Sequence, residues 1–286
     1  MPNITSEVNT TGTPLRRLVD EYKALLDSWR TQLRAELTDQ ASWLLPPNNQ
    51  RASIAGLAVD YRARWFLTGV DQLPAAVERG LEYCTPATVE AIRVAYAKVR
   101  GLGPGVHPTE TEGAIAKVAA ACATVEPLFR RGPIVPCPLD ALGYEEFLDQ
   151  YADVIGDVVR LAGVPPDLLD DEIGRRIEPG PILGCGRLSG DGDLLVDDTL
   201  IEVKCVSNPM SESAKTLRQV LVYAARAGTD HASLVLPRQQ MRVDFDLTAH
   251  RNQLDHLDGN IVRVYGSTPR PSRQLNRAAA SRSSGD

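Results

Sequence analysis

The chain of 286 residues is long enough for one large domain or two ordinary ones, and its 43% hydrophobic and 24% charged residues are typical of a globular protein. The sequence has no apolar run of about 18 residues and its polar start does not resemble a signal peptide, so we expect neither a membrane span nor a membrane partner. The formal net charge of −6 argues against a uniformly basic protein that coats nucleic acid.

The cysteines point to a reducing environment. They are five in number, an odd count at scattered positions, which favours free thiols in a cytoplasmic protein. A zinc site is not predicted, because there is no Cys-x-x-Cys pair and the histidines do not cluster with cysteines. Cys185 and Cys205 fall on neighbouring predicted strands, and we interpret them as small buried side chains.

Up to about residue 175 the sequence predicts helices almost throughout. Apolar side chains recur at helical spacing, and Pro/Gly stretches such as 101–105 and 132–136 separate the segments. The expected helices are 15–37, 51–68, 74–83, 86–99, 110–130, 143–163 and 166–176. Trp29, Trp43 and Trp65 are expected in the core rather than as stacking platforms for bases. Residues 1–175 are therefore predicted to form a large, mostly helical N-terminal region.

Residues 191–206 predict a β-hairpin that carries charged side chains. Asp193 opens the first strand, an Asp-Asp pair supplies the turn, and Glu202 and Lys204 lie in the second strand. Side chains alternate between the faces of a strand, so Glu202 and Lys204 point to the same side, and the hairpin brings Asp193 towards them. Two carboxylates and an ammonium are costly to bury unless they bind something. The alternative is an exposed hairpin in which Glu202 and Lys204 face water.

Such a trio predicts a divalent-metal site. Asp193 and Glu202 offer hard oxygen ligands for Mg²⁺ or Mn²⁺, and the carbonyl of Val203 is a candidate further ligand. A bound metal lowers the pKa of its water and neutralises charge on a phosphate. Lys204 is placed to orient or activate the attacking water and to stabilise the transition state.

A helix is predicted over residues 214–226, followed by a strand over 232–237. Gly228 ends the helix, and an apolar stripe along one side suits it to a core. Gln219 and Tyr223 stand at i and i+4, so they share one helical face.

The order strand, strand, helix, strand, with Asp193, Glu202-Val-Lys204 and Gln219-x-x-x-Tyr223, resembles the core of the PD-(D/E)XK nuclease superfamily. More narrowly, it resembles the branch whose helix carries a Gln-x-x-x-Tyr signature. The resemblance covers residues 180–236. It implies a restriction-endonuclease-like fold in which Asp193 and Glu202 bind metal and Lys204 assists the nucleophilic water, with Gln219 and Tyr223 beside the site and the DNA.

Two shorter upstream segments also resemble parts of the family. Gly56-x-x-x-Asp60-Tyr-x-x-Arg64 is similar to an early helix of some prokaryotic members, and Glu126-Pro-Leu-Phe-Arg130 to a helix end that precedes the nuclease core. Family members often add one acidic residue from an early helix, and Asp60 and Glu126 are the candidates here. The alternative for Asp60 and Arg64 is an ordinary salt bridge on a helix surface.

We therefore expect an α/β protein with a restriction-endonuclease-like mixed-sheet core at 176–265, preceded by the helical region and followed by a disordered tail at 266–286. The expected activity is hydrolysis of phosphodiester bonds in DNA with Mg²⁺ or Mn²⁺, in prokaryotic defence or genome maintenance by analogy of fold alone. Arg175 and Arg176 are candidate phosphate contacts, and the alternative for them is a solvated helix end. The alternatives are a non-catalytic scaffold that binds nucleic acid or protein, and a nuclease that acts on RNA. A protein partner or a homo-oligomer remains open.

Overall fold

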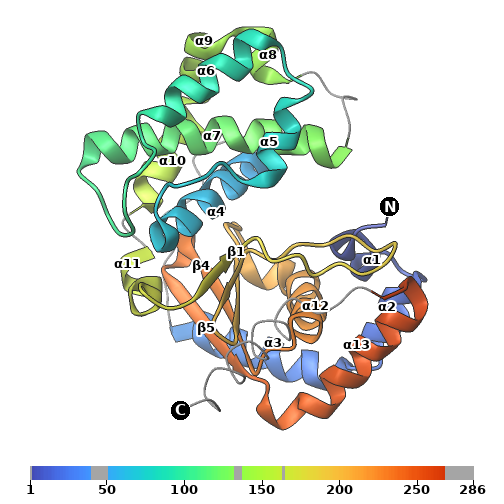
Figure 1. Cartoon of the computed structure of the whole chain (residues 1–286). Helices are drawn as coiled ribbons and strands as arrows, with labels where there is room; N and C mark the ends of the chain where they lie inside the picture. The colour runs from blue at the N-terminus through green and yellow to red at the C-terminus, as the bar shows by residue number, and fades with distance from the viewer. Residues whose placement is uncertain (1, 40–50, 132–136, 163–164, 268–286) are drawn as a thin grey trace, which may run out of the picture.

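The computed structural model describes residues 2–39, 51–131, 137–162 and 165–267 and has a mixed α/β fold (Figure 1). The α-helices are α1 (Ile4–Asn9), α2 (Pro14–Asp20), α3 (Lys23–Asp39), α4 (Ala52–Thr68), α5 (Ala75–Leu81), α6 (Pro86–Ala97), α7 (Thr109–Arg131), α8 (Pro138–Leu142), α9 (Tyr144–Gln150), α10 (Ala152–Leu161), α11 (Pro165–Leu169), α12 (Pro209–Ala227) and α13 (Arg251–Tyr265). The strands are β1 (Ile177–Pro179), β2 (Leu194–Val196), β3 (Thr199–Val203), β4 (His231–Leu236) and β5 (Met241–Asp246). Within the described part of the chain, no helix combines the length and apolarity needed to cross a membrane.

The strands form one five-stranded sheet in the order β1-β2-β3-β4-β5. Strands β3 and β4 are parallel, whereas the other neighbouring pairs are antiparallel. Parallel neighbours need a crossover connection, and α12 provides it. The expected α/β class and the order strand, strand, helix, strand are confirmed by β2, β3, α12 and β4.

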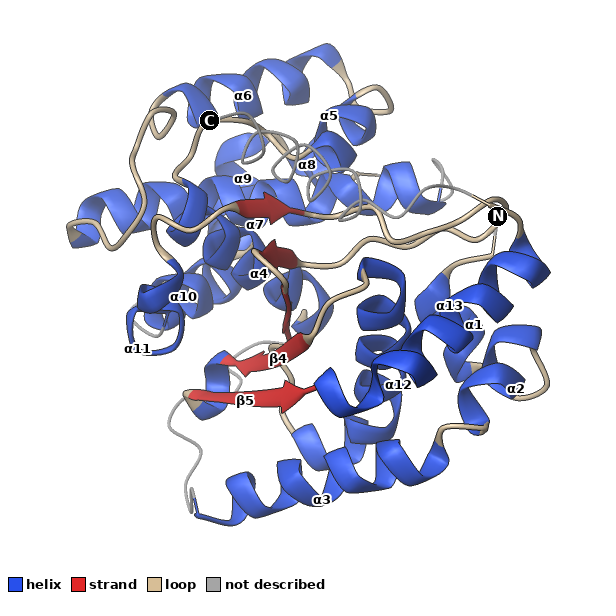
Figure 2. Cartoon of the chain, turned by 60° about the horizontal axis from the view of Figure 1, so that its bottom comes forward, coloured by secondary structure: helices blue, strands red, loops and turns tan. Residues whose placement is uncertain are grey.

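Each face of the sheet is covered by helices. The alternation in β3 turns Leu200 towards α12 and turns Ile201 and Val203 towards Phe66 of α4. The side of α4 that faces away from the sheet packs against α7 and α10, and α5 and α6 pack on α7, so that these helices form a separate layer. Figure 1 shows this layer on one side of α4 and the sheet on the other, and Figures 1 and 2 show α12, α13 and the N-terminal helices beyond the sheet.

The N-terminal helices belong to the core of the sheet. The single helix expected over 15–37 is two helices, because Leu15 of α2 packs beside Tyr265 of α13 whereas α3 runs under β5. Trp29 of α3 stacks on Phe245 of β5, with ring centroids 4.8 Å apart. The described residues up to 175 are thus helical in their regular structure, as expected, but they are divided among three hydrophobic clusters.

Several expected elements differ at their ends or were missed. The segment 143–163 breaks at Tyr151, where the backbone leaves helical geometry. The helix expected over 166–176 is wrong beyond Glu172, and neither β1 nor β5 was predicted. Helix α12 begins earlier than expected, at Pro209, because the Asn208 side chain accepts a hydrogen bond from the N–H of Ser211.

The tryptophans and cysteines largely fill core positions. Trp29 and Trp65 are buried, as predicted, whereas Trp43 lies outside the described residues, as does the tail from 268 onwards. Cys185 and Cys205 pack in different hydrophobic clusters, so the approach between them that the predicted strands allowed is not realised.

Candidate active site

The β2–β3 hairpin sets the spacing of the first two acidic residues. Asp197 adopts a left-handed φ of 52° in its turn, a conformation that aspartate tolerates. The register pairs Leu194 with Ile201, so Asp193 and Glu202 come next to each other at the open end of the hairpin. The backbone N–H of Asp193 donates to Oε1 of Glu202 at 3.3 Å.

Asp193, Glu202 and Lys204 form one ion-paired cluster. The Nζ atom of Lys204 lies 2.6 Å from Oε2 of Glu202 and 3.4 Å from Oδ2 of Asp193. The same Oδ2 accepts a hydrogen bond of 2.7 Å from the N–H of Val203. Glu202 is fully buried, so the alternative of a hairpin whose charges face water is wrong for this residue.

Helix α12 adds Gln219 and Tyr223 to the side of Glu202. The amide of Gln219 donates to Oε2 of Glu202 at 3.4 Å. The hydroxyl of Tyr223 lies 3.5 Å from Oγ1 of Thr5 in α1, and either group can be the donor. The expected i,i+4 pair therefore faces the hairpin, but only Gln219 has a described hydrogen bond to one of its carboxylates.

Helix α4 brings a third carboxylate and a second cation. The Nη2 atom of Arg64 lies 2.6 Å from Oδ2 of Asp60 and 3.4 Å from Oδ1 of Asp193. The i,i+4 salt bridge is thus present, but Asp60 is buried, Arg64 is half-buried, and the pair joins the hairpin instead of lying on a helix surface. Gly180 closes over it, since a Cβ atom at this position would approach Nη1 of Arg64 to 2.9 Å.

Glu126 lies one step away from this cluster. It accepts hydrogen bonds from the hydroxyl of Tyr61 and from Arg130. Arg130 in turn binds both carboxylate oxygens of Asp191 at 2.8 and 2.6 Å. Of the two acidic candidates from early helices, the described contacts therefore connect Asp60 more closely to Asp193.

Burial and mutual repulsion make two of these carboxyl groups weak acids. Burial raises the pKa of Glu202 to about 8, with a further rise from Asp193 and an opposing effect of Lys204. Burial also raises the pKa of Asp60 to about 7, which Arg64 opposes and Asp193 increases. Burial acts to lower the pKa of Lys204, but Asp193 and Glu202 outweigh it and raise that pKa, so the ammonium stays charged.

The donor set fits a hard divalent cation. Three carboxylates, from Asp60, Asp193 and Glu202, face two cations, Arg64 and Lys204, so the ionised cluster carries one uncompensated negative charge. Buried carboxylate oxygens in excess are the ligands that Mg²⁺ and Mn²⁺ prefer. The ammonium of Lys204 lies between the carboxylates of Asp193 and Glu202, where such a cation would also bind.

The expected phosphate contacts lie elsewhere. Arg175 pairs with Glu172 and borders a polar hollow of about 520 Å³ that also exposes Asp170 and Asp171. Arg176 donates to the carbonyl of Asp197 at 3.3 Å. Neither arginine has a described contact with Asp193, Glu202 or Lys204, and the acidic surroundings of Arg175 disfavour a phosphate there.

No protein-family model, curated protein or solved structure matches this chain. The site is therefore interpreted from its own geometry. Sequence reasoning identified Asp193, Glu202, Lys204 and Gln219 as neighbours. It gave Arg64 no role in the site, left a surface salt bridge with Asp60 as the alternative, and did not consider Gly180. The Gly-x-x-x-Asp-Tyr-x-x-Arg spacing was the available signal for Arg64.

Proposed function

We propose that this protein is a metal-dependent nuclease with a restriction-endonuclease-like core, and that it hydrolyses phosphodiester bonds in DNA. The observation that carries the proposal is the convergence of three carboxylates and Lys204 at the end of the hairpin, with Glu202 fully buried. A buried carboxylate cluster of this kind is costly to the fold and is typical of functional sites.

Asp193 and Glu202 would hold Mg²⁺ or Mn²⁺, with Asp60 as the third acidic group and the carbonyl of Val203 as a candidate ligand. When bound, the metal would supply a water of lowered pKa and neutralise charge on the phosphate. Gln219 positions Glu202 through its hydrogen bond, and Arg64 positions Asp60 and Asp193 through its two ion pairs. These contacts hold the acidic groups in register before a ligand arrives.

Lys204 supplies the positive charge nearest to the reacting phosphate. Its side chain is 21% exposed whereas that of Glu202 is 0% exposed, so a substrate reaches the ammonium first. The ammonium offers three donors, with which it orients the attacking water and stabilises negative charge on the phosphate oxygens. Tyr223 borders the same side of α12 and would support the site rather than act on the substrate.

One observation favours the alternative of a non-catalytic scaffold that binds nucleic acid or protein. Each charged group of the cluster already has an ion-pair partner inside the protein, so the network holds α4 to the hairpin without any ligand. A scaffold of this kind would need neither a divalent metal nor an intact Lys204.

Cleavage assays separate the two functions. Single-stranded, linear and supercoiled DNA, and RNA, would be incubated with the wild type in Mg²⁺ or Mn²⁺ and in EDTA. We expect metal-dependent cleavage of DNA that falls by about 10³-fold in Glu202→Gln and Lys204→Ala, since each removes a charge from the reacting centre. Preferential cleavage of RNA would keep the mechanism and change the substrate.

A matched control lies on α12. Glu212 and Lys215 form an exposed acid–lysine pair, with Nζ 3.8 Å from Oε2, away from the cluster. Glu212→Gln and Lys215→Ala repeat the same chemical changes and should cleave like the wild type. If folded Glu202→Gln and Lys204→Ala also cleave like the wild type, the proposed mechanism is wrong.

A further inference from the structure

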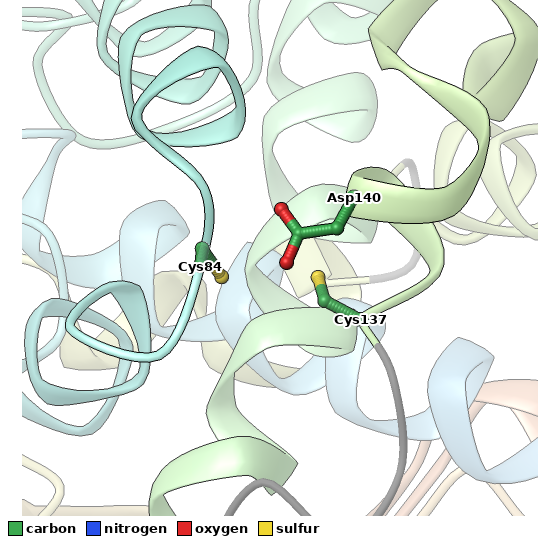
Figure 3. Close-up of side chains that lie close together, drawn as sticks. All are labelled: Cys84, Cys137 and Asp140. Carbon is green, nitrogen blue, oxygen red and sulfur yellow. The ribbon is translucent and has the colours of Figure 1, made fainter.

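A second group of potential metal ligands lies in the helical layer. Cys84 follows α5, Cys137 immediately precedes α8, and Asp140 lies in the first turn of α8. One ligand atom from each side chain lies within 4.8 Å of the other two. Figure 3 shows the two sulfur atoms and the carboxylate of Asp140 directed towards one another from these separate segments.

The surroundings hold these side chains in place. Oδ1 of Asp140 accepts hydrogen bonds of 2.9 Å from both the N–H and the hydroxyl of Thr85. Cys137 is buried, and Cys84 is half-buried. The sulfur atoms of Cys84 and Cys137 lie within 4.8 Å of each other. The carboxylate is thus oriented from outside the group, and both thiols lie close to it.

The ligand types select a class of metal. Two thiolates are soft ligands that suit Zn²⁺ and do not suit Mg²⁺, and Zn²⁺ also accepts a carboxylate oxygen as a ligand. In a tetrahedral site with usual Zn–S and Zn–O distances, the ligand atoms lie ~3.5–3.8 Å apart. Closing the present group to that geometry requires side-chain movements on the order of 1 Å, with no change in the helices.

We propose that Cys84, Cys137 and Asp140 bind a thiophilic divalent cation of the zinc type, with water as the fourth ligand. Both thiols lose their protons to solvent on binding, and the cation ties the α5–α6 connection to the start of α8. The expectation that the chain has no zinc site relied on the lack of a Cys-x-x-Cys pair, whereas the fold brings the two cysteines together from distant positions. The proposal is independent of the nuclease site, which is built on α4, β2, β3 and α12.

Cobalt substitution tests this site directly. The reduced full-length protein would be titrated with Co²⁺ while thiolate-to-cobalt charge-transfer absorption and the visible bands of tetrahedral Co²⁺ are recorded. We expect one equivalent to give these thiolate bands and to be displaced from this site by Zn²⁺. Cys84→Ser, Cys137→Ser and Asp140→Asn should each weaken Co²⁺ binding at least tenfold. Cys185→Ser, a matched change at another buried thiol, and Glu202→Gln should leave the spectrum unchanged.

A second measurement avoids dependence on folded variants. Zn²⁺ should protect Cys84 and Cys137 of the wild type from alkylation by iodoacetamide, as measured by peptide mass spectrometry, and should leave labelling of Cys205 unchanged. The proposal is overturned if Co²⁺ gives no thiolate absorption, or if that absorption survives in folded Cys137→Ser. It is equally overturned if Cys84 and Cys137 form a disulfide in the isolated protein and the reduced thiols bind neither Co²⁺ nor Zn²⁺.

Discussion

Helix α4 carries two buried groups of charges that differ in their balance. On one side, Arg62 forms a two-pronged ion pair with Glu112, with N–O distances of 2.6 and 2.8 Å. Arg62 also donates to the carbonyl of Gly105, and Glu112 accepts from the N–H of His107. One cation meets one carboxylate, and the backbone supplies further hydrogen bonds. This pair is a neutral connection between α4 and the first turn of α7.

On the other side of α4, Asp60 and Arg64 join Asp193, Glu202 and Lys204, and carboxylates outnumber cations. The pKa of Glu202 is raised to about 8 and that of Asp60 to about 7, mainly by burial, so the fold resists full ionisation there. A buried charge is therefore not by itself a sign of function. An excess of buried carboxylates over cations is a more specific sign of a functional site, because a bound cation neutralises the excess negative charge.

The largest effect on stability is expected from the neutral pair. Arg62→Met should lower the free energy of unfolding by about 3–5 kcal/mol, because it leaves Glu112 buried without its cation. Urea unfolding monitored by circular dichroism measures the loss, which should be the same with Mg²⁺ and with EDTA. A loss below about 1 kcal/mol would place this pair with weak surface ion pairs and remove the basis of the comparison.

Mg²⁺ or Mn²⁺ should stabilise the folded protein through the carboxylate cluster of Asp60, Asp193 and Glu202, and not through the Arg62–Glu112 pair. At a concentration 100 times its dissociation constant, Mg²⁺ or Mn²⁺ should raise the free energy of unfolding by about 2.7 kcal/mol. Lys204→Met removes the ammonium that competes for the carboxylates, so this variant should bind the metal more tightly than the wild type while losing cleavage. Arg62→Met should show the same metal-induced increase as the wild type. Equal stability of the wild type in Mg²⁺ and EDTA would support the scaffold instead.

The carboxylate excess should also make stability depend on pH. The folded pKa of Glu202, about 8, lies above the ordinary glutamate value, so the folded state holds a proton that the unfolded state releases. This contribution is fully favourable below about pH 4.5 and is lost as the pH rises towards 8. Glu202→Gln should therefore reduce the decline in metal-free stability over this range by roughly 1.4 kcal/mol per pH unit.

Chemical denaturation in EDTA at a series of pH values measures the slope of the free energy of unfolding against pH. Glu212→Gln is the matched control, because Glu212 is exposed on α12 and its replacement should leave the slope unchanged. Asp60 contributes in the same direction over a lower range, as its pKa rises from 3.8 to about 7. An unchanged slope in Glu202→Gln would show that Glu202 is ionised throughout and that Lys204 alone balances it.

The pairing of the hairpin could be predicted from sequence because it depends on local rules. Alternation along a strand put Glu202 and Lys204 on one side, and the two-residue turn brought Asp193 opposite Glu202. The contribution of α4 could not be derived in this way. The approach of Arg64 to Asp193 depends on how a distant helix crosses the sheet, and no local spacing fixes that crossing. Cys84, Cys137 and Asp140 escaped prediction for the same reason.

The predicted elements show the same limit. The helices with strong periodicity were found, but β5 was missed although Met241, Val243 and Phe245 alternate with polar residues as a half-buried strand requires. The sequence placed Tyr223 on the correct face of α12, yet it gave no sign that its hydroxyl would lie beside Thr5 of α1. Helix α1 precedes the sheet by most of the chain, so its position is decided by packing in the core and not by any local pattern.

The smallest effect is therefore expected from Tyr223, and its replacement tests whether the site extends beyond the carboxylates. Its hydroxyl has a distance of 3.5 Å to Thr5 Oγ1, which is long for a hydrogen bond between hydroxyl groups. Tyr223→Phe should lower the free energy of unfolding by less than about 1 kcal/mol and cleavage by less than about tenfold. Gln219→Leu removes a described donor to Glu202 and should reduce cleavage more strongly. If Tyr223→Phe instead abolishes cleavage in folded protein, the hydroxyl acts on the substrate, and the site extends along α12 beyond the carboxylates of the hairpin.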